Sequence, residues 1–427
     1  MRLFNLTFAI TAALIAVSCE TATEGGGRTP EEPDAVTGYT ALQKRSAKRG
    51  VSFNFGQIPD NDVPLLATAC SWSYNWGISN SDEVYAQFAK YDMDFLPMIW
   101  NANWSEQTVR DFKAAHPECE YILAYNEPNL SDQANMTPTQ AAQDWPRVVA
   151  IAKELGMKII APAMNYGTLA GYNDPWKWYD EFFSLPGISW DDVDGVALHC
   201  YMGSATAMMD FVKGFKKYGK PIWVTEFCNW ANNNISLDAQ MKYMVEAINA
   251  LEAEEQVARY AWFIPRGYGN SECNNNLLSD RKPFGLTELG KVFVNMSTQD
   301  KDLWYVPGQV IPAEHYSGYT GAVHLLPCTD VIGELELYDL KKDTAVEYQV
   351  ELPSKGTYGL GIRYQTYMET TLRIEVDGQS LGLLELPDTS YEWSDFDVNI
   401  PLEAGKHTLR ISGTTAYPVR LNWLRLY

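Results

Sequence analysis

Basic residues are scarce in this sequence of 427 residues: Lys and Arg number 33 against 54 Asp and Glu, which gives a formal net charge of −21. Nucleic acids and anionic membrane surfaces are bound by clustered cations, because both partners carry dense negative charge. The charge balance therefore excludes nucleic acid as a partner and disfavours direct binding to anionic lipid.

Histidine and cysteine are also few, with 5 and 7 residues, and neither type falls in a metal-binding pattern. No pair of cysteines is spaced as C-x-x-C, and no H-E-x-x-H motif occurs. Both absences argue against a catalytic metal held by the protein. Six cysteines remain besides Cys19, and the sequence leaves their pairing open.

The N-terminus has the pattern of an export signal. Arg2 precedes an apolar run over 3–17, and the run ends in Ala-Val-Ser-Cys at Cys19. This segment resembles a bacterial lipobox, so residues 1–19 are predicted to be a lipoprotein signal peptide with Cys19 lipidated; the alternative is an ordinary secretory signal. Residues 20–43 are predicted to be a flexible tether, and the protein is expected at the cell envelope, as an outer-membrane or cell-surface lipoprotein.

From 44 to 300 short β-branched or aromatic runs alternate with longer stretches of helical periodicity. Eight such alternations predict a (β/α)8 TIM barrel as the catalytic domain. A nucleotide-binding doubly wound sheet is disfavoured, because no G-x-G-x-x-G or P-loop follows the first run. The expected strands are 50–55, 70–74, 95–100, 121–126, 158–163, 195–199, 222–226 and 260–264, and the expected helices include 81–91, 106–116, 139–155, 205–218 and 237–255.

The composition changes after Asp300. Short alternating runs are separated by turn residues, such as Asp377-Gly378, which is typical of a tight hairpin. Residues 301–427 are therefore predicted to form an all-β sandwich. The expected strands are 347–352, 356–364, 371–376, 395–400, 407–412 and 420–427.

Two glutamates end expected strands in uncharged, aromatic surroundings. Glu127 lies in Asn-Glu-Pro after the fourth strand, and Glu226 lies in Trp-Val-Thr-Glu-Phe at the end of the seventh. The carboxyl ends of barrel strands share one face, so the two carboxyl groups are expected to meet there. Retaining glycoside hydrolysis needs such a pair, one as nucleophile and one as acid, about 5–5.5 Å apart. Taken singly, each could instead be a capping or ion-paired residue.

These motifs resemble those of the clan A glycoside hydrolases. With the segments at 75–77, 97–100, 198–201 and 260–263, the sequence from about 44 to 296 is most similar to glycoside hydrolase family 128, the endo-β-1,3-glucanases and their glucan-binding relatives. The resemblance implies that Glu127 protonates the leaving oxygen and later activates water. It implies that Glu226 attacks the anomeric carbon, and that Asn126 binds the sugar 2-hydroxyl.

The resemblance also assigns the surroundings of the pair. His199 and Tyr201 would orient Glu226 or contact the sugar, and Trp262 would form the aromatic floor of the cleaving subsite. Trp76 and Trp100 would be further sugar platforms. Each of these residues could instead be structural, a satisfied buried histidine or an aromatic that seals the barrel.

Tyr74 and Asn103 are further candidates at the same face. One departure from many clan members is that no arginine occurs between Gly50 and Arg110, so an arginine on the second strand that would support the nucleophile is missing. This departure puts the hydrogen bonds around the nucleophile in doubt, and leaves the assignment of the two glutamates in place.

The segments 309–316 and 419–425 resemble the two ends of family 6 or 35 carbohydrate-binding modules. The resemblance implies a β-sandwich, and a structural calcium ion with Glu314 among its ligands. It also suggests sugar binding through Tyr364, Trp393 or Tyr417 stacked with Asn422. The alternative is a sandwich that only braces the catalytic domain.

The sequence thus predicts a monomeric, retaining endo-glycoside hydrolase of β-1,3-glucan, of the laminarin or curdlan type. No organic cofactor is expected, since two carboxyl groups suffice. Two alternatives stay open: a non-catalytic surface protein that binds β-glucan, and a clan A hydrolase of β-mannan or β-1,4-glucan.

Overall fold

The computed structural model describes residues 43–427. The predicted signal peptide at 1–19, with Cys19, and the tether up to residue 42 lie outside the described residues. Among the residues described, no helix is both long enough and apolar enough to cross a membrane.

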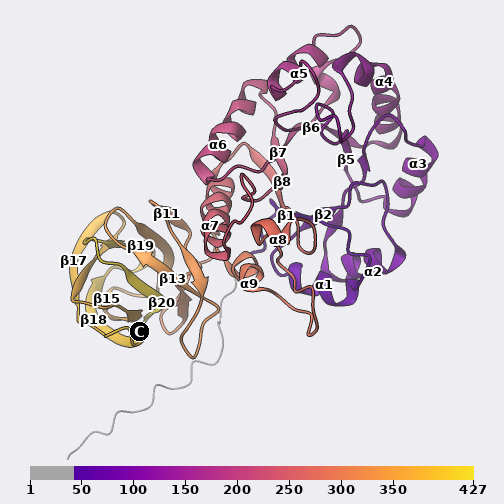
Figure 1. Ribbon diagram of the computed structural model, residues 1–427. Helices are drawn as coiled ribbons and strands as arrows, with labels where there is room; N and C mark the ends of the chain where they lie inside the picture. The colour runs from indigo at the N-terminus through magenta and orange to yellow at the C-terminus, as the bar shows by residue number, and fades with distance from the viewer. Residues whose placement is uncertain (1–42) are drawn as a thin grey trace, which may run out of the picture. The chain divides into compact units, whose positions relative to one another are not determined.

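The first part of the chain forms a parallel sheet that curls around an axis, with helices around its outside (Figure 1). The strands pair in the order β3-β2-β1-β9-β8-β7-β6-β5-β4. Their bounds are β1 Arg49–Ser52, β2 Trp72–Tyr74, β3 Asp94–Phe95, β4 Met98–Ile99, β5 Tyr121–Ala124, β6 Lys158–Met164, β7 Gly195–Cys200, β8 Ile222–Phe227 and β9 Val257–Trp262.

The two edges of this sheet, β3 and β4, follow each other in the chain with only Leu96 and Pro97 between them. The single strand expected over 95–100 is therefore divided, and the sheet has nine strands where eight were expected. Pro97 has no N–H to donate to a neighbouring strand, and the chain changes partner here, from β2 to β5. The parallel sheet with outer helices is confirmed, whereas its strand pairing is open at this point.

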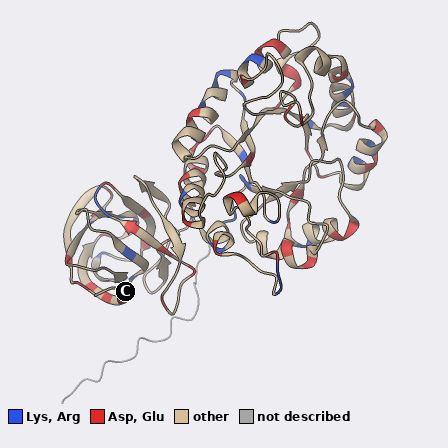
Figure 2. Cartoon of the chain, viewed as in Figure 1, with Lys and Arg blue, Asp and Glu red and all other residues tan. Residues whose placement is uncertain are grey.

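Helices follow the strands, and most of them begin at a residue whose side chain caps the first turn. The hydroxyls of Ser81, Ser105, Thr137, Ser204 and Ser236 each accept a backbone N–H of the first turn. The helices are α1 Pro59–Leu66, α2 Asp82–Tyr91, α3 Glu106–Ala115, α4 Pro138–Leu155, α5 Pro175–Phe182, α6 Ala205–Gly214, α7 Leu237–Ala253, α8 Asn270–Cys273 and α9 Glu288–Asn295, with 3-10 turns η1 Trp190–Asp192 and η2 Phe215–Tyr218. Charged residues are spread along these helices, whereas the strands of the parallel sheet are largely uncharged (Figure 2).

The second part of the chain consists of two antiparallel sheets, as expected. One has the order β12-β13-β20-β15-β18, with β10 also paired to β20, and the other has the order β11-β14-β19-β16-β17. The turn between β16 and β17 is Asp377-Gly378, and both residues have positive φ, 50° and 76°, as a tight hairpin requires. The strands are β10 Val310–Pro312, β11 Gly318–Thr320, β12 Leu325–Pro327, β13 Leu335–Leu340, β14 Ala345–Leu352, β15 Gly356–Gln365, β16 Thr370–Val376, β17 Gln379–Leu386, β18 Ser394–Leu402, β19 Gly405–Gly413 and β20 Val419–Leu426.

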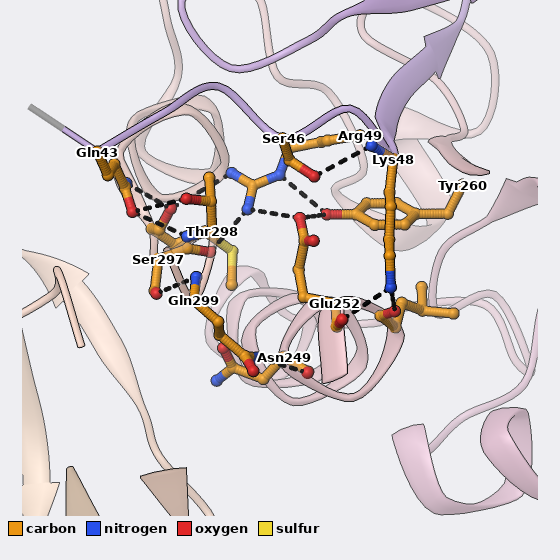
Figure 3. Close-up of polar contacts among 12 residues, drawn as sticks. Gln43, Ser46, Lys48, Arg49, Asn249, Glu252, Tyr260, Ser297, Thr298 and Gln299 are labelled. Carbon is orange, nitrogen blue, oxygen red and sulfur yellow. Dashed lines mark hydrogen bonds and ion pairs between the residues drawn. The ribbon is translucent and has the colours of Figure 1, made fainter. Parts of the chain in front are cut away.

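A buried arginine fastens the start of β1 to the chain that follows α9 (Figure 3). Arg49 is fully buried. Its guanidinium donates to Tyr260 Oη at 3.0 Å, to the carbonyls of Phe293 and Ser297 at 3.0 and 2.8 Å, and to Glu252 Oε1 at 3.4 Å. A buried charge is tolerated only where it is paired and fully hydrogen-bonded, as it is here.

Replacing Arg49 by Met should destabilise the protein by about 3–5 kcal/mol, because the buried Glu252 carboxylate keeps the hydrogen bond from Tyr260 but loses its ion pair, and two carbonyls lose the guanidinium donor. Urea unfolding measures the loss. The matched control is Arg110→Met: Arg110 pairs with Glu154 at 2.7 Å on the surface, where ion pairs contribute little. Equal, small effects of both substitutions would contradict the role given to Arg49.

Candidate active site

Most of the predicted site residues lie at the carboxyl ends of the parallel strands and line one cavity. Glu226 is in β8, Glu127 follows β5, and Trp76 and Trp100 follow β2 and β4. The cavity has a volume of about 480 Å³. It is lined by Trp76, Trp100, Asn126, Glu127, Leu130, Gln133, Asn165, Tyr201, Glu226, Trp230, Phe263 and Tyr268.

The carboxyl group of Glu226 is surrounded by hydrogen-bond donors. Its Oε1 accepts the hydroxyl of Tyr74 at 2.8 Å and the indole N–H of Trp76 at 2.7 Å. Its Oε2 accepts the hydroxyl of Tyr201 and lies 3.5 Å from Nδ1 of His199. Tyr74 in β2 and Trp76 just after it thus donate to the Glu226 carboxylate. They take the place of the second-strand arginine that the sequence lacks.

The carboxyl group of Glu127 has fewer donors. Its Oε1 lies 2.9 Å from Nδ1 of His199 and accepts the side-chain amide of Asn165 at 3.1 Å. His199 is fully buried, and its Nδ1 faces both glutamates. One imidazole therefore lies between the two carboxyl groups.

The three groups shift one another's proton affinity. Burial raises the pKa of Glu226, and the charge of Glu127 adds to the effect. Although burial acts in the opposite direction, the charge and hydrogen bond of His199 lower the pKa of Glu127. Burial lowers the pKa of His199, but the two carboxylates outweigh it and the net shift is upward. The site can thus hold one ionised and one protonated carboxyl group together.

Asn126 places one unsatisfied polar atom at the cavity. Its amide N–H donates to Gln133 Oε1 at 3.2 Å, and its own Oδ1 is buried and has no protein donor. A buried acceptor without a partner is costly unless something donates to it. A ligand hydroxyl could satisfy it.

Trp262 corrects the sequence analysis, because it does not line the cavity. It is fully buried, its indole N–H donates to the carbonyl of Asn275 at 2.8 Å, and its ring packs against Phe227. The next residue, Phe263, lines the cavity instead and packs against Tyr201 with ring centroids 5.5 Å apart. Successive strand residues point to opposite sides, so an error of one residue exchanges the two rings.

Other lining residues were not singled out from the sequence: Asn165, Trp230 and Tyr268 lie on loops after β6, β8 and β9. Trp230 and Tyr268 could have been predicted as aromatic residues that follow a strand closely. No feature of the sequence distinguishes Asn165. The candidate Asn103 is exposed on its loop and is not among the residues around the cavity.

In the C-terminal sheets Glu314 is buried. Its Oε1 accepts the N–H of Leu335 at 3.2 Å, and its Oε2 has no protein donor. Tyr364 and Asn422 are buried too, so the suggested sugar stacking on these two residues is wrong. Tyr417 is 45% exposed and belongs to a different aromatic group, described below.

Paired carboxyl groups in an aromatic cavity, at the carboxyl ends of parallel strands, are the arrangement of enzymes that cleave glycosidic bonds. The family model of the glycosyl hydrolase catalytic core matches residues 50–293. The chain belongs to this family.

The solved structures that are similar to this chain include two enzymes of the same subgroup. An endo-β-1,3-glucanase of glycoside hydrolase family 128, subgroup II, from Pseudomonas viridiflava is 39% identical, with a TM-score of 0.54 over 59% of this chain and 98% of its own. A second subgroup II enzyme, from Sorangium cellulosum, is 32% identical, with a TM-score of 0.51 over 58% and 97%. The resemblance to family 128 is thereby confirmed.

A curated relative is the Alkali-sensitive linkage protein 1 of Schizosaccharomyces pombe, which is 28% identical over 264 residues. The match covers 58% of this chain and 45% of that protein. This chain therefore spans less than half the length of that relative.

Proposed function

We propose that this protein is a retaining, endo-acting glycoside hydrolase that cleaves β-1,3-glucan. The observation that carries the proposal is the placement of both glutamates within reach of one ring nitrogen, 2.9 Å from Glu127 and 3.5 Å from Glu226. These carboxyl oxygens can be no farther apart than the two distances together. This limit admits the ~5–5.5 Å that separates the carboxyl groups of retaining enzymes.

The linkage is taken from the similar structures. Both subgroup II enzymes are endo-β-1,3-glucanases. The matched part of this chain covers nearly the whole length of each of them. A polysaccharide also suits an open cavity with tryptophan and tyrosine walls, whose flat faces match the C–H faces of sugar rings.

In the proposed reaction, an oxygen of Glu226 attacks the anomeric carbon while the glycosidic bond breaks and the leaving oxygen takes the proton of Glu127. Water then gives a proton to Glu127 and attacks the same carbon, which frees the Glu226 carboxylate and restores the β configuration. Three hydrogen-bond donors, Tyr74, Trp76 and Tyr201, stabilise the ionised form of Glu226. Asn126, with its free acceptor, would bind the 2-hydroxyl.

The proton must be on Glu127 when the bond breaks, although in the free site the pKa of Glu226 is the one that is raised. His199 contacts both carboxyl groups through Nδ1. We assign to it the transfer of the proton from one to the other when a sugar enters. A positive charge that develops on the sugar then stabilises ionised Glu226.

The finer fold belongs to the same proposal. Because only Leu96 and Pro97 separate the two edge strands β3 and β4, we regard residues 94–99 as one strand of a closed (β/α)8 barrel. The boundaries 44–300 for the barrel and 301–427 for the sandwich are part of this proposal, as is a monomeric state.

Glu127→Gln should lower hydrolysis of linear β-1,3-glucan by about 10²–10⁴-fold, because the proton donor is lost. Glu226→Ala should abolish turnover and change glucan binding only a few fold, because the aromatic walls are intact. Reducing-sugar release and affinity electrophoresis measure the two effects.

The control for these variants is Glu118→Gln, an exposed glutamate outside the cavity. Normal activity of Glu226→Ala would contradict the mechanism. Binding without release by the wild type would favour the glucan-binding alternative. Release from β-mannan or β-1,4-glucan alone would favour the other linkages.

A structural calcium ion is proposed for the sandwich. Glu314 Oε2 and Asn422 Oδ1 are buried oxygens without a protein donor, and hard cations take such ligands. In the described part of the chain no group of three His, Cys, Asp or Glu side chains comes together. The ligands of the ion would thus be the carboxylate of Glu314, the side-chain amide oxygen of Asn422 and carbonyl oxygens.

Burial raises the pKa of Glu314 from 4.5 to about 8. A raised folded-state pKa gives stability that is fully present below pH 4.5 and is lost as the pH rises through 8. Without calcium, the melting temperature should fall over this window, and Glu314→Gln should flatten the fall. Calcium should raise the melting temperature at pH 8 in wild type only. An equal rise in Glu314→Gln would contradict the calcium site.

Sugar binding by the sandwich is proposed for three tyrosines on neighbouring loops. Tyr367 and Tyr391 stack with ring centroids 5.5 Å apart, and Tyr417 lies edge-on to Tyr367 at 6.1 Å. Tyr391 is 61% exposed and Tyr417 is 45% exposed. Such a group offers flat apolar faces with polar edges, as sugar rings require.

The double substitution Tyr391→Ala and Tyr417→Ala should weaken binding to insoluble β-1,3-glucan roughly tenfold, the loss of about 1.4 kcal/mol of stacking. Hydrolysis of a short soluble oligosaccharide should not change. Pull-down with the polysaccharide measures binding. Tyr338→Ala is the control, since this exposed tyrosine of β13 packs against Arg420 instead. Unchanged binding of the double variant would assign the sandwich a bracing role.

The location is proposed from the sequence alone. The lipobox-like segment with Cys19 supports a lipid-anchored protein on the cell envelope, where a neutral polysaccharide would be met outside the cell.

A further inference from the structure

The backbone that carries Glu127 departs from an extended strand. Tyr125 and Glu127 have positive φ, 57° and 46°, a region that side-chain-bearing residues rarely adopt. In an extended strand successive side chains point to opposite faces. Here Asn126 and Glu127 both line the cavity. The two left-handed residues therefore place two successive side chains in the same cavity.

The side chain of Tyr125 lies away from the cavity, against α4. Its ring packs against Trp145 with centroids 6.0 Å apart, and it is fully buried. Its hydroxyl donates to Oδ2 of Asp144 at 2.8 Å. Asp144 lies within α4, which is the helix that follows the loop of Glu127.

Asp144 also holds a second loop. The indole N–H of Trp104 donates to its Oδ2 at 2.8 Å, and Arg147 donates to its Oδ1 at 2.6 Å. Trp104 lies between β4 and α3, on the same connection as Trp100, which lines the cavity. One nearly buried carboxylate thus contacts two of the connections that form the cavity.

Left-handed backbone at a residue other than glycine persists only where surrounding contacts hold it. At Tyr125 these contacts are backbone bonds to Ile99 and Ala163, at 2.7 and 2.9 Å, and the hydroxyl bond to Asp144. The backbone bonds fix the chain within the sheet. The hydroxyl bond and the packing on Trp145 fix the direction of the side chain at the start of the turn into Asn126 and Glu127.

We propose that Tyr125 and Asp144 are a positioning pair for the proton donor: their hydrogen bond holds the left-handed turn that aims Glu127 at the glycosidic oxygen. This inference rests on the proposed role of Glu127 as general acid. Neither residue touches the sugar. Their effect should therefore be confined to steps in which Glu127 transfers a proton.

The test compares two substrates with different leaving groups. When linear β-1,3-glucan is cleaved, the leaving group is a sugar hydroxyl, which needs the proton of Glu127. When a 2,4-dinitrophenyl β-laminaribioside is cleaved, the leaving group is a stable phenolate, which does not need that proton. kcat/KM reports the steps up to bond cleavage, in which Glu127 donates its proton. It does not report the later step in which Glu127 activates water. Tyr125→Phe should lower kcat/KM for the glucan at least ~10-fold, since small misplacements cost up to about 10²-fold. For the aryl glycoside the change should stay within about twofold.

Variants of the partner provide a second test. Asp144→Leu should show the same selective loss, because no acceptor remains for the hydroxyl. Asp144→Asn should retain most of the activity, because its amide oxygen can still accept from Tyr125. Tyr348→Phe is the matched control. Tyr348 is a buried tyrosine of β14 whose hydroxyl donates to the carbonyl of Ala313, and loss of this hydroxyl should leave kcat/KM unchanged for both substrates.

Equal losses on both substrates, or no loss on either, would overturn the inference. If Tyr125→Phe does not fold, the contrast between Asp144→Leu and Asp144→Asn decides in its place. Glu127→Gln separates this failure from that of the proposed function. If that variant loses activity equally on both substrates, Glu127 is not the general acid; if it is selective and the Tyr125 and Asp144 variants are not, only the positioning pair is wrong.

Discussion

The site depends on one imidazole placed between two buried carboxyl groups. Two carboxylates at this separation would repel each other, and burial would favour neutralising both. His199 reduces that repulsion by contacting Glu127 and Glu226 through the same nitrogen. Burial raises the pKa of Glu226, whereas the charge and hydrogen bond of His199 outweigh burial and lower the pKa of Glu127. The two carboxyl groups therefore differ in proton affinity.

Backbone strain at the carboxyl ends of the strands serves the same arrangement. Positive φ occurs at Trp76 as well as at Tyr125 and Glu127. After β5 the turn places the successive side chains of Asn126 and Glu127 in one cavity. After β2, Tyr74 and Trp76 both reach Oε1 of Glu226. Such strain persists where a rigid scaffold holds it, and all six residues of β8 are buried.

Much of this could be predicted from the sequence, because the strands are buried apolar runs and the two glutamates end two of them. The limits are equally physical. The choice between Trp262 and Phe263 depends on strand register, which composition does not reveal. β17 was missed: Leu381 and Leu383 do alternate with small residues, but the first five residues of the strand are exposed and Gly382 interrupts the run. Left-handed backbone at Tyr125 is set by a partner in a later helix, so no local pattern announces it.

The two ends of the parallel sheet differ in how completely their buried polar groups are hydrogen-bonded. At the start of β1, Arg49 joins Glu252, Tyr260 and the chain after α9 with every charge paired. At the other end, Asn126 and His199 keep buried polar atoms without protein partners. An enzyme can leave such groups for its substrate only if stability is supplied elsewhere, and the parallel sheet separates the two along its strands. The satisfied network at one end is therefore the physical counterpart of the unsatisfied cavity at the other.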